Sequence, residues 1–359
     1  MINFDIRKKL QRNNYILRSR KISTALRKIL SKEKIGIIDI GAGHRYLPII
    51  LNFDGLSKIA MVDPNKSLDW SFSNFKKIIK YPENLLKFKF GISDKTSKNR
   101  YYITNTLTGS TFIDIFKIAK KNKKKLSKSY FGYKKSVIQQ VYSYKKFIST
   151  FFKYDVDIIK IDVEGLEGKI IKSIVKYSKP YLIEVETNLN SNIYPNSFDE
   201  INTLLKKNKY KLITGFPIYM RSKNSIKNEP FTLGNYDNPI LRAPLEQFEC
   251  IYVKEKKNYN LKEIIILLGY GFIHEAQKII KLSKTSLTNK KLSLINKFIQ
   301  KFYKNFWFDL LRFIFFLEKI MLLLILFFIK LLEFIWIKFF FIRDVSKNMT
   351  FKILINKLI

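Results

Sequence analysis

The stretch "IIKIDVEGLEGKII", residues 158–171, decides the fold. Three of its first four residues are isoleucine, as in a buried strand, yet the apolar run stops at Asp162 and Glu164 before Gly165. Strands that are apolar on both faces are typical of parallel sheets with helices on either side. Such sheets bind their ligands at the carboxyl ends of the strands. We therefore expect Asp162 and Glu164 to lie at a functional site.

Short apolar runs alternate with polar, helix-like stretches from Ile35 to about Lys254. This alternation predicts an α/β fold with a doubly wound, mostly parallel sheet. The expected strands are residues 35–40, 58–63, 86–94, 156–165, 179–187, 210–216 and 248–254. Two stretches interrupt the pattern, namely a lysine-rich segment at 117–135, expected to be an exposed loop or lid, and a long connection at 219–247.

The composition is strongly basic, with 67 Lys and Arg residues against 29 Asp and Glu residues and a net charge of +38 over 359 residues. A charge of this sign favours anionic partners, such as phosphates, acidic glycans, nucleic acid or an anionic membrane surface. The single cysteine, Cys250, excludes an internal disulfide and a cysteine-based zinc site, which fits a reducing compartment. Residues 1–22 are basic but lack an apolar centre, so we expect an amphipathic helix and not a secretory signal.

The character of the sequence changes after about Asn258, where helical patterns replace the alternation. The segment 305–344 is rich in Phe, Leu, Ile and Trp, but its longest uncharged run is 320–329. That run is far short of the roughly 20 residues that a spanning helix needs. The charges leave one side of the helix entirely apolar, which favours a helix lying in a membrane interface. A tilted or hairpin-like insertion and an oligomerisation or packing helix are the alternatives.

A glycine-rich turn follows the first expected strand in "IIDIGAGHRYLPIIL", residues 37–51. The strand nears its end at Asp39, and the turn Gly41-Ala42-Gly43 lets the backbone approach a ligand closely. The third glycine of a dinucleotide motif is replaced by Tyr46, so a pyrophosphate fits poorly. An acidic residue before G-x-G resembles the first motif of S-adenosylmethionine-dependent methyltransferases. The alternative is a structural glycine turn, which any α/β sheet can contain.

Further candidate cofactor residues follow at the ends of later strands. In "IAMVDPNKS", residues 59–67, Asp63 can accept both ribose hydroxyls of a nucleoside, although an aspartate before proline also begins turns. In "FGISD", residues 90–94, we expect Ser93 or Asp94 near the adenine. His44, in the glycine loop, can touch the carboxylate of the cofactor, act as a base or stabilise the turn.

The block "VYSYKKFISTFFKYDVDIIKIDVEGLEGKIIKSI", followed by "KPYLIEVET", resembles the central part of FkbM-type methyltransferases, with a K-I-D-V-E-G box after a strand. "GSTFID", residues 109–114, resembles the serine-bearing segment of that family. The resemblance covers roughly residues 34–256, and His44-Arg45 departs from the smaller or neutral pair usual in the first motif. It implies a class I, Rossmann-like methyltransferase fold with a seven-stranded sheet, S-adenosylmethionine as cofactor, and methyl transfer to oxygen, often on a sugar or secondary metabolite.

The chemistry of the box can be argued from its residues. Methyl transfer to a hydroxyl requires precise positioning and a base or metal ion that handles the hydroxyl proton. We expect Asp162, Glu164 and Glu186 to be the catalytic carboxylates, with Glu184 beside them. Such a group can hold Mg²⁺ or a similar divalent cation, bind sugar hydroxyls or satisfy backbone N–H groups, so the sequence leaves a metal undetermined. Lys160 should share the face of Asp162.

The sequence thus predicts four parts, namely a basic N-terminal helix (1–33), a methyltransferase domain (34–256), a helical linker (257–302) and an apolar amphipathic tail (303–359). We expect a cytoplasmic O-methyltransferase of a sugar, glycan or lipid-linked saccharide, held peripherally on the inner membrane face by anionic lipid at 303–342. One alternative is a nucleic-acid methyltransferase, against which the absence of an N/D-P-P-[YF] box argues. The other is a non-catalytic membrane-bound scaffold. The oligomeric state is not encoded in any motif.

Overall fold

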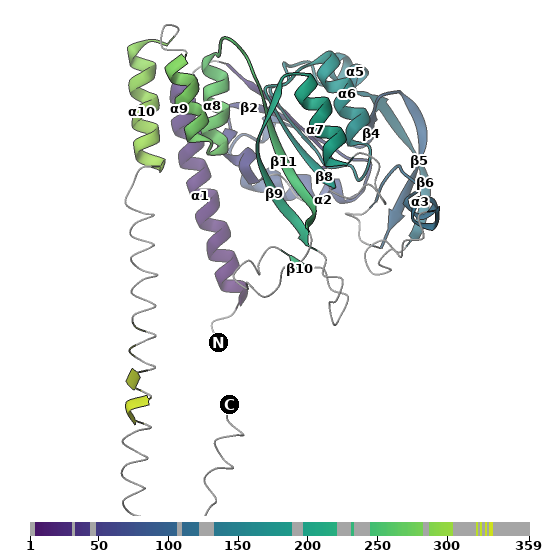
Figure 1. Cartoon of the computed structure of the whole chain (residues 1–359), viewed down its shortest axis with the longest axis horizontal. Helices are drawn as coiled ribbons and strands as arrows, with labels where there is room; N and C mark the ends of the chain where they lie inside the picture. The colour runs from purple at the N-terminus through teal and green to yellow at the C-terminus, as the bar shows by residue number, and fades with distance from the viewer. Residues whose placement is uncertain are drawn as a thin grey trace, which may run out of the picture. The chain divides into compact units, whose positions relative to one another are not determined.

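The computed structural model divides the chain into two compact units, Met1–Phe298 and Ile299–Ile359. Figure 1 shows the first unit as a sheet with helices on both sides. The structure describes residues 4–30, 33–43, 48–105, 110–121, 133–188, 197–220, 231–232, 245–282, 287–303, 321, 324, 327–328 and 330–332.

The main sheet has the strand order β10-β9-β11-β8-β7-β1-β2-β3. Its members are β1 (Ile35–Ile40), β2 (Ser57–Val62), β3 (Leu85–Phe88), β7 (Ile158–Ile161), β8 (Leu182–Asn188), β9 (Tyr210–Met220), β10 (Phe231–Thr232) and β11 (Leu245–Lys254). Strands β3, β2, β1, β7 and β8 pair in parallel, whereas β11 is antiparallel to both of its neighbours. The predicted doubly wound, mostly parallel sheet is therefore confirmed, and β10 adds a two-residue edge to seven longer strands.

The topological switch point of the sheet is at β1. Strands β2 and β3 lie on one side of it, and β7 and β8 lie on the other. All six residues of β1 are buried, which explains why the sequence there is apolar on both faces. Asp39 is paired in register with Lys160, and Lys160 with Glu184. Residues in register share a face of the sheet, so these three charged side chains form one row across it.

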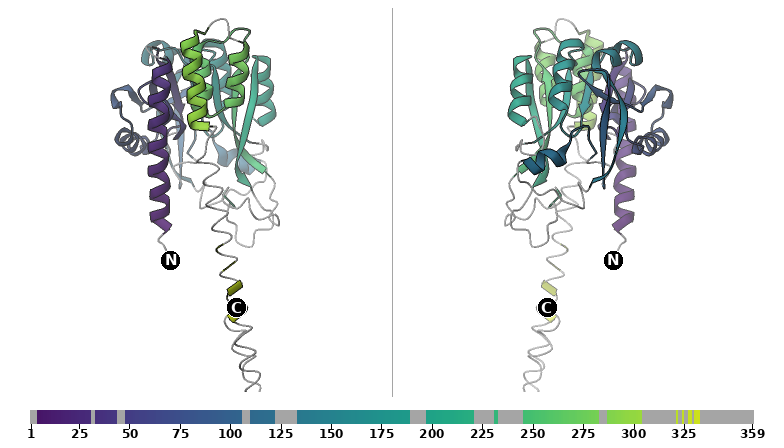
Figure 2. Two further views of the ribbon diagram at one scale, coloured as in Figure 1. Left: turned by 90° about the vertical axis from the view of Figure 1, so that its left-hand side faces the viewer. Right: turned by 90° about the vertical axis from the view of Figure 1, so that its right-hand side faces the viewer.

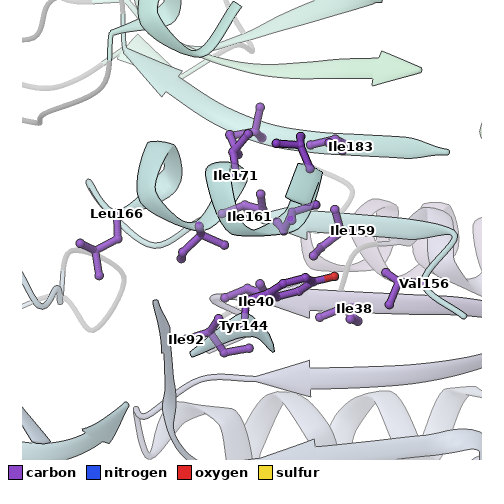
Figure 3. Close-up of a cluster of buried hydrophobic side chains, with 14 of the residues drawn as sticks. Ile38, Ile40, Ile92, Tyr144, Val156, Ile159, Ile161, Leu166, Ile171 and Ile183 are labelled. Carbon is purple, nitrogen blue, oxygen red and sulfur yellow. The ribbon is translucent and has the colours of Figure 1, made fainter. Parts of the chain in front are cut away.

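One face of the sheet packs against α5 (Tyr144–Lys146), the helical turn Phe147–Phe151, α6 (Glu167–Tyr177) and α7 (Phe198–Lys207). Figure 3 shows this core, in which Ile40, Ile161 and Ile183 of three strands meet Tyr144 and Ile171. The opposite face is covered by α1 (Phe4–Leu30), η1 (Pro48–Phe53), α8 (Leu261–Tyr270) and α9 (Ile273–Leu282), as the two views of Figure 2 also show. Each face therefore has its own helical layer.

A second, three-stranded sheet is inserted between β3 and β7 and has the order β4-β6-β5. It is formed by β4 (Gly91–Ser93), β5 (Ser97–Thr104) and β6 (Tyr133–Ser143). The expectation of one strand over 86–94 is wrong, because the chain leaves the main sheet after Phe88 and pairs again at Gly91, opposite Val141. A Cβ on Gly91 would lie 2.5 Å from the Phe112 ring, so a larger residue at this crossing would displace that ring.

The remaining helices lie at the ends of strands and beyond the sheets. They are α2 (Ser67–Ile78), η2 (Pro82–Asn84), α3 (Ile115–Lys121) and α10 (Asn289–Tyr303). The lysine-rich segment predicted as a loop or lid at 117–135 is helical up to Lys121 and becomes β6 at Tyr133, and its middle lies outside the described residues. Most of the connection at 219–247 also lies outside them.

In the second unit, the described residues of the apolar tail are solvent-exposed. They include Met321, Leu324, Phe327, Phe328, Leu331 and Leu332. No helix among the residues that the structure describes is both long and apolar enough to cross a membrane.

Candidate functional site

The glycine loop after β1 lies where three strand ends converge. Gly41 has a φ of 92°, and a Cβ there would overlap the backbone carbonyl of Asp162 at the end of β7. A Cβ on Gly43 would lie 2.6 Å from Oδ2 of Asp63, which follows β2. Both glycines are therefore required by the close approach of neighbouring segments. The loop brings the first predicted motif against both predicted strand-end carboxylates.

Asp39 is buried beneath this loop with no solvent exposure. Neither of its carboxylate oxygens has a hydrogen-bond partner within the part of the chain that the structure describes. Burial raises the pKa of Asp39 to about 7, and nearby Lys160 opposes that rise. An orphaned buried carboxyl of this kind can accept a hydrogen bond from a ligand, a water molecule or a cation.

Asp63 is nearly buried, and backbone groups hold its carboxylate. Oδ1 accepts a hydrogen bond from the backbone N–H of Asn65 at 2.6 Å, and the backbone N–H of Gly43 also donates to the carboxylate. Burial raises the pKa of Asp63 to about 7 in spite of these bonds. Ser67 Oγ, which lies beside Gly43, has no partner among the described residues. This turn therefore presents a fixed acceptor next to an unpaired hydroxyl.

The other predicted cofactor residues lie in the inserted sheet, in the turn after its strand β4 or in the glycine loop. Ser93 ends β4, and its hydroxyl donates a hydrogen bond of 2.9 Å to Asp94 Oδ1. Ser93 belongs to the inserted sheet and Asp94 to the turn after it, because the chain leaves the main sheet before them. Ala42 is buried in the glycine loop, whereas His44 lies outside the described residues.

The D-V-E-G turn after β7 is held by a glutamate that the sequence argument overlooked. Glu164 has a φ of 55° and Gly165 a φ of 112°, so the backbone makes a tight left-handed bend. The carboxylate of Glu167 accepts hydrogen bonds from the backbone N–H groups of Val163 at 3.2 Å and of Gly165 at 2.9 Å. Burial raises the pKa of Glu167 to about 7 against these bonds. Glu167 is visible in the sequence as the second glutamate of this stretch, three residues after Glu164 and at the start of α6.

The three predicted catalytic carboxylates come together at the strand ends. Asp162, Glu164 and Glu186 are partly exposed, and each offers an oxygen that lies within 4.8 Å of the other two. Burial and then the charges of Asp162 and Glu164 raise the pKa of Glu186 well above its usual value. The arrangement can accept a proton or hold a hard cation.

A partly buried lysine lies beside this group. Lys160 Nζ is 3.2 Å from Asp162 Oδ2 and 3.8 Å from Glu249 Oε1, and its side chain is 12% exposed. Burial lowers the pKa of Lys160, but the surrounding carboxylates, Asp162 first, outweigh that effect and raise it well above its usual value. The ammonium group is therefore charged, and it fixes the orientation of Asp162.

Glu184 lies deeper than the sequence argument placed it, since it is only 3% exposed. The hydroxyl of Tyr270, at the end of α8, donates a hydrogen bond of 3.1 Å to Glu184 Oε2. Burial, followed by the charge of Glu249, raises the pKa of Glu184 well above its usual value. Tyr270 and Glu249 were missed because their proximity depends on strand register and helix packing, which no local motif encodes.

Comparison with known proteins adds the following findings. The family model described as the methyltransferase FkbM domain matches residues 39–212. Solved structures with similarity include methyltransferase FkbM from Methylobacillus flagellatus KT, at 11% identity and a TM-score of 0.32, with 61% of this chain and 43% of that chain covered. The chain thus spans less than half the length of that protein. No curated protein matches the chain.

Two further structures were solved with S-adenosylhomocysteine. One is the 1,6-didemethyltoxoflavin-N1-methyltransferase of Burkholderia thailandensis, at 10% identity and a TM-score of 0.30, with 67% of this chain and 79% of that chain covered. The other is TrmK of M. capricolum, at 15% identity and a TM-score of 0.28, with 78% and 95% covered. The family match includes the glycine loop, Asp63 and the D-V-E-G turn. Residues 39–212 match the methyltransferase FkbM domain, and the main sheet has the class I methyltransferase fold.

Proposed function

We propose that this protein transfers a methyl group from S-adenosylmethionine to a hydroxyl of a sugar, a glycan or a lipid-linked saccharide. The observation that carries the proposal is the group Asp162, Glu164 and Glu186, whose oxygens lie within 4.8 Å of one another beside the glycine loop. Three adjacent carboxylate side chains suit an acceptor with several hydroxyl donors, because each oxygen accepts hydrogen bonds.

The residues around the glycine loop fit the cofactor. Gly41 and Gly43 leave the backbone of the loop uncovered, so a ligand can approach it closely, and a side chain at either position would fill that space. Asp63 would hold the ribose hydroxyls, and Ser93 and Asp94 the adenine. The orphaned oxygens of Asp39 suit the positive end of the cofactor, directly or through water. When bound, S-adenosylmethionine supplies an electrophilic methyl group on a sulfonium.

The strand-end carboxylates would position the acceptor and take its proton. The pKa of Glu186 is raised, and a carboxylate with a raised pKa is a better proton acceptor. Asp162, held by Lys160, and Glu164, held at the left-handed bend, would orient the hydroxyl for in-line attack. A divalent cation at the same oxygens is the alternative, and it would activate the hydroxyl directly. Removing metal ions with EDTA decides between the two, because only the cation mechanism loses turnover.

The test begins with titration calorimetry of S-adenosylhomocysteine into the full chain, which should show saturable binding. Turnover with a panel of glycosides and lipid-linked saccharides is then followed by release of S-adenosylhomocysteine. Glu186→Gln should retain cofactor binding and lose turnover at least about 100-fold, the range that a general base contributes. Glu255→Gln, at an exposed carboxylate, is the matched control. Absence of binding in a folded chain would reject methyl transfer and favour the scaffold alternative.

We further propose that the tail docks the enzyme on an anionic membrane surface, on the cytoplasmic side. The support comes from Met321, Leu324, Phe327, Phe328, Leu331 and Leu332, all of which are exposed. Their spacings of three and four residues place them on one helical face. Such a face, on a chain with a net charge of +38, suits a bilayer that contains anionic lipid.

Vesicle co-sedimentation of the full chain tests the docking. Binding should be stronger to vesicles with phosphatidylglycerol than to pure phosphatidylcholine, and should weaken in Phe327→Glu. Ile138→Glu, at an exposed apolar residue of β6, is the control that should bind as the unaltered chain does. Binding to RNA with no preference for vesicles would instead support the nucleic-acid alternative.

A further inference from the structure

The inserted sheet carries a large share of the positive charge of the chain. From the start of β4 to the end of β6, residues 91–143, the sequence has 12 Lys and Arg residues and two acidic ones. This stretch of 53 residues supplies more than a quarter of the net charge of +38 on about one seventh of the length. The density of positive charge here is thus nearly twice the average of the chain.

The two acidic residues of this stretch do not neutralise its cations. Asp94 Oδ1 accepts a hydrogen bond of 2.9 Å from the Ser93 hydroxyl. Asp114 accepts one of 2.9 Å from the backbone N–H of Lys117 and one of 3.3 Å from the hydroxyl of Tyr102. Neither carboxylate forms an ion pair with another residue that the structure describes. The cations therefore lack an anionic partner within the described part of their own sheet.

Exposed cations lie on the outer face of this sheet, which stands apart from the main sheet together with α3 (Figure 1). Lys98 and Arg100 of β5 are exposed, whereas Tyr101, next in the strand, points to the opposite face and is buried. Arg100 pairs in register with Ile138 of β6, which is 62% exposed. The face that carries Lys98 and Arg100 is therefore open to solvent at this point.

Helix α3 and the start of β6 extend this positive surface. The ring of Phe116 packs edge-on against that of Tyr133, with centroids 5.5 Å apart. Their exposed neighbours Lys117 and Lys134 therefore lie at the same junction. None of the four cations forms an ion pair within the described residues. We call these four residues the basic surface, namely Lys98, Arg100, Lys117 and Lys134.

The basic surface ends at the candidate catalytic turn. Tyr102, two residues after Arg100 and on the same face of β5, exchanges backbone hydrogen bonds of 2.8 and 3.0 Å with Thr111. The Thr111 hydroxyl donates at 2.8 Å to the backbone carbonyl of Glu164. At roughly 3.4 Å per residue, Arg100 and Lys98 lie about 7 and 14 Å along the strand from Tyr102. A chain of several sugars laid along β5 therefore connects both cations with the catalytic turn.

We propose that the basic surface binds an acidic glycan and thereby selects the methyl acceptor. Its cations pair with acidic groups on one part of the glycan, while a neutral hydroxyl of another sugar reaches Asp162, Glu164 and Glu186. This inference rests on the proposed methyl transfer to a saccharide and narrows that acceptor to the anionic class. Exposed lysine and arginine side chains suit such a partner, because a surface of one sign attracts the opposite charge without a preformed pocket.

The carboxylates of the catalytic turn favour a glycan over a nucleic acid. Asp162, Glu164 and Glu186 each offer an oxygen within 4.8 Å of the other two, so this end of the site repels anions. A nucleic acid carries a phosphate on every nucleotide and would bring negative charge to these carboxylates. A glycan with an acid on only some of its sugars keeps its charge on the basic surface and offers an uncharged hydroxyl to the carboxylates.

Charge reversal on the basic surface tests the proposal. The full chain is titrated into a fluorescein-labelled hyaluronan oligosaccharide, which has a carboxylate on every second sugar, and fluorescence anisotropy reports binding. Lys98→Glu with Arg100→Glu should weaken the affinity at least about 10-fold, because two attractive contacts become repulsive. The matched control is Lys206→Glu with Lys207→Glu, at the exposed end of α7. It changes the net charge equally and should bind hyaluronan almost as the unaltered chain does.

Two further ligands separate this inference from its alternatives. A single-stranded RNA with the same number of charges should bind the unaltered chain more weakly than hyaluronan does. Equal losses in the two charge-reversed variants, stronger binding of RNA, or no binding of hyaluronan would overturn the inference. If the reversal at β5 lowers the melting temperature, Lys98→Gln with Arg100→Gln repeats the test without adding acidic groups. S-adenosylhomocysteine should bind all of these proteins alike in calorimetry, and its failure to bind the unaltered chain would instead overturn the proposed function.

Discussion

Asp39→Asn should make the folded protein more stable at neutral pH while weakening cofactor binding. The substitution keeps the shape of the side chain and removes its charge. Asp39 has no solvent exposure and no hydrogen-bond partner for either oxygen among the described residues. Its charged form is therefore poorly solvated in the absence of a ligand. A site that binds a cationic ligand can retain such a residue at a cost in stability.

The magnitude follows from the pKa. Burial raises the pKa of Asp39 from 3.8 to about 7. Between about pH 4 and pH 7 the folded chain holds a proton that the unfolded chain has released, so stability falls as the pH rises. At about 1.4 kcal/mol per pH unit, Asp39 destabilises the fold by about 4 kcal/mol at pH 7 and by almost nothing below pH 4. Asp39→Asn should therefore be about as stable as the unaltered chain below pH 4 and about 4 kcal/mol more stable at pH 7.

Urea denaturation of both proteins at several pH values measures this difference. Asp199→Asn is the matched control, because Asp199 is exposed and its substitution should change the free energy of unfolding little. Titration of S-adenosylhomocysteine at pH 7 should show weaker binding to Asp39→Asn. A variant that is less stable than the unaltered chain at neutral pH, or a difference that does not change with pH, would refute the argument.

Three other substitutions probe the same site. Gly41→Ala should abolish binding of S-adenosylhomocysteine, measured by calorimetry, because the new Cβ would overlap the backbone carbonyl of Asp162. Glu167→Ala should lower the free energy of unfolding by about 2 kcal/mol in urea, since it leaves two backbone N–H groups of the D-V-E-G turn without their acceptor. Tyr270→Phe should cost about 1 kcal/mol in the same assay and leave cofactor affinity unchanged, because its hydroxyl contacts the buried Glu184.

The sequence carries enough information for the central strands but less for the elements around them. The strands at 35–40 and 158–161 are apolar on both faces because helices cover both, so their pattern is local and strong. The stretch at 86–94 alternates apolar and polar residues as one strand would, and only pairing shows that it contributes to two sheets. The strand-end carboxylates were predictable because parallel strands bring their ends together.

Contacts that depend on register or on distant segments were not predictable. The pairing of Glu249 with Lys160 follows from the antiparallel register of β11 on β8. The hydroxyl of Thr111 donates to the backbone carbonyl of Glu164 because the segment after β5 of the inserted sheet folds back on the main sheet. Neither relation leaves a periodic signal in the sequence.

The buried acids offer an independent reason to place the cofactor near Asp39. The chain carries 38 more basic than acidic residues, yet every charged residue that is less than 9% exposed in the described part of the chain is acidic. These residues are Asp39, Asp54, Asp63, Glu167, Glu184 and Glu263. Five of the six accept hydrogen bonds from backbone N–H groups or from a side chain.

Asp39 alone among these six has no such donor. Buried carboxylates are nearly always satisfied, so the exception calls for a group that the bare chain lacks. A ligand that brings a positive charge to the end of β1 would supply it, and S-adenosylmethionine carries both an ammonium and a sulfonium. The gain in stability expected for Asp39→Asn and the expected loss of cofactor affinity are therefore two consequences of one unsatisfied carboxyl.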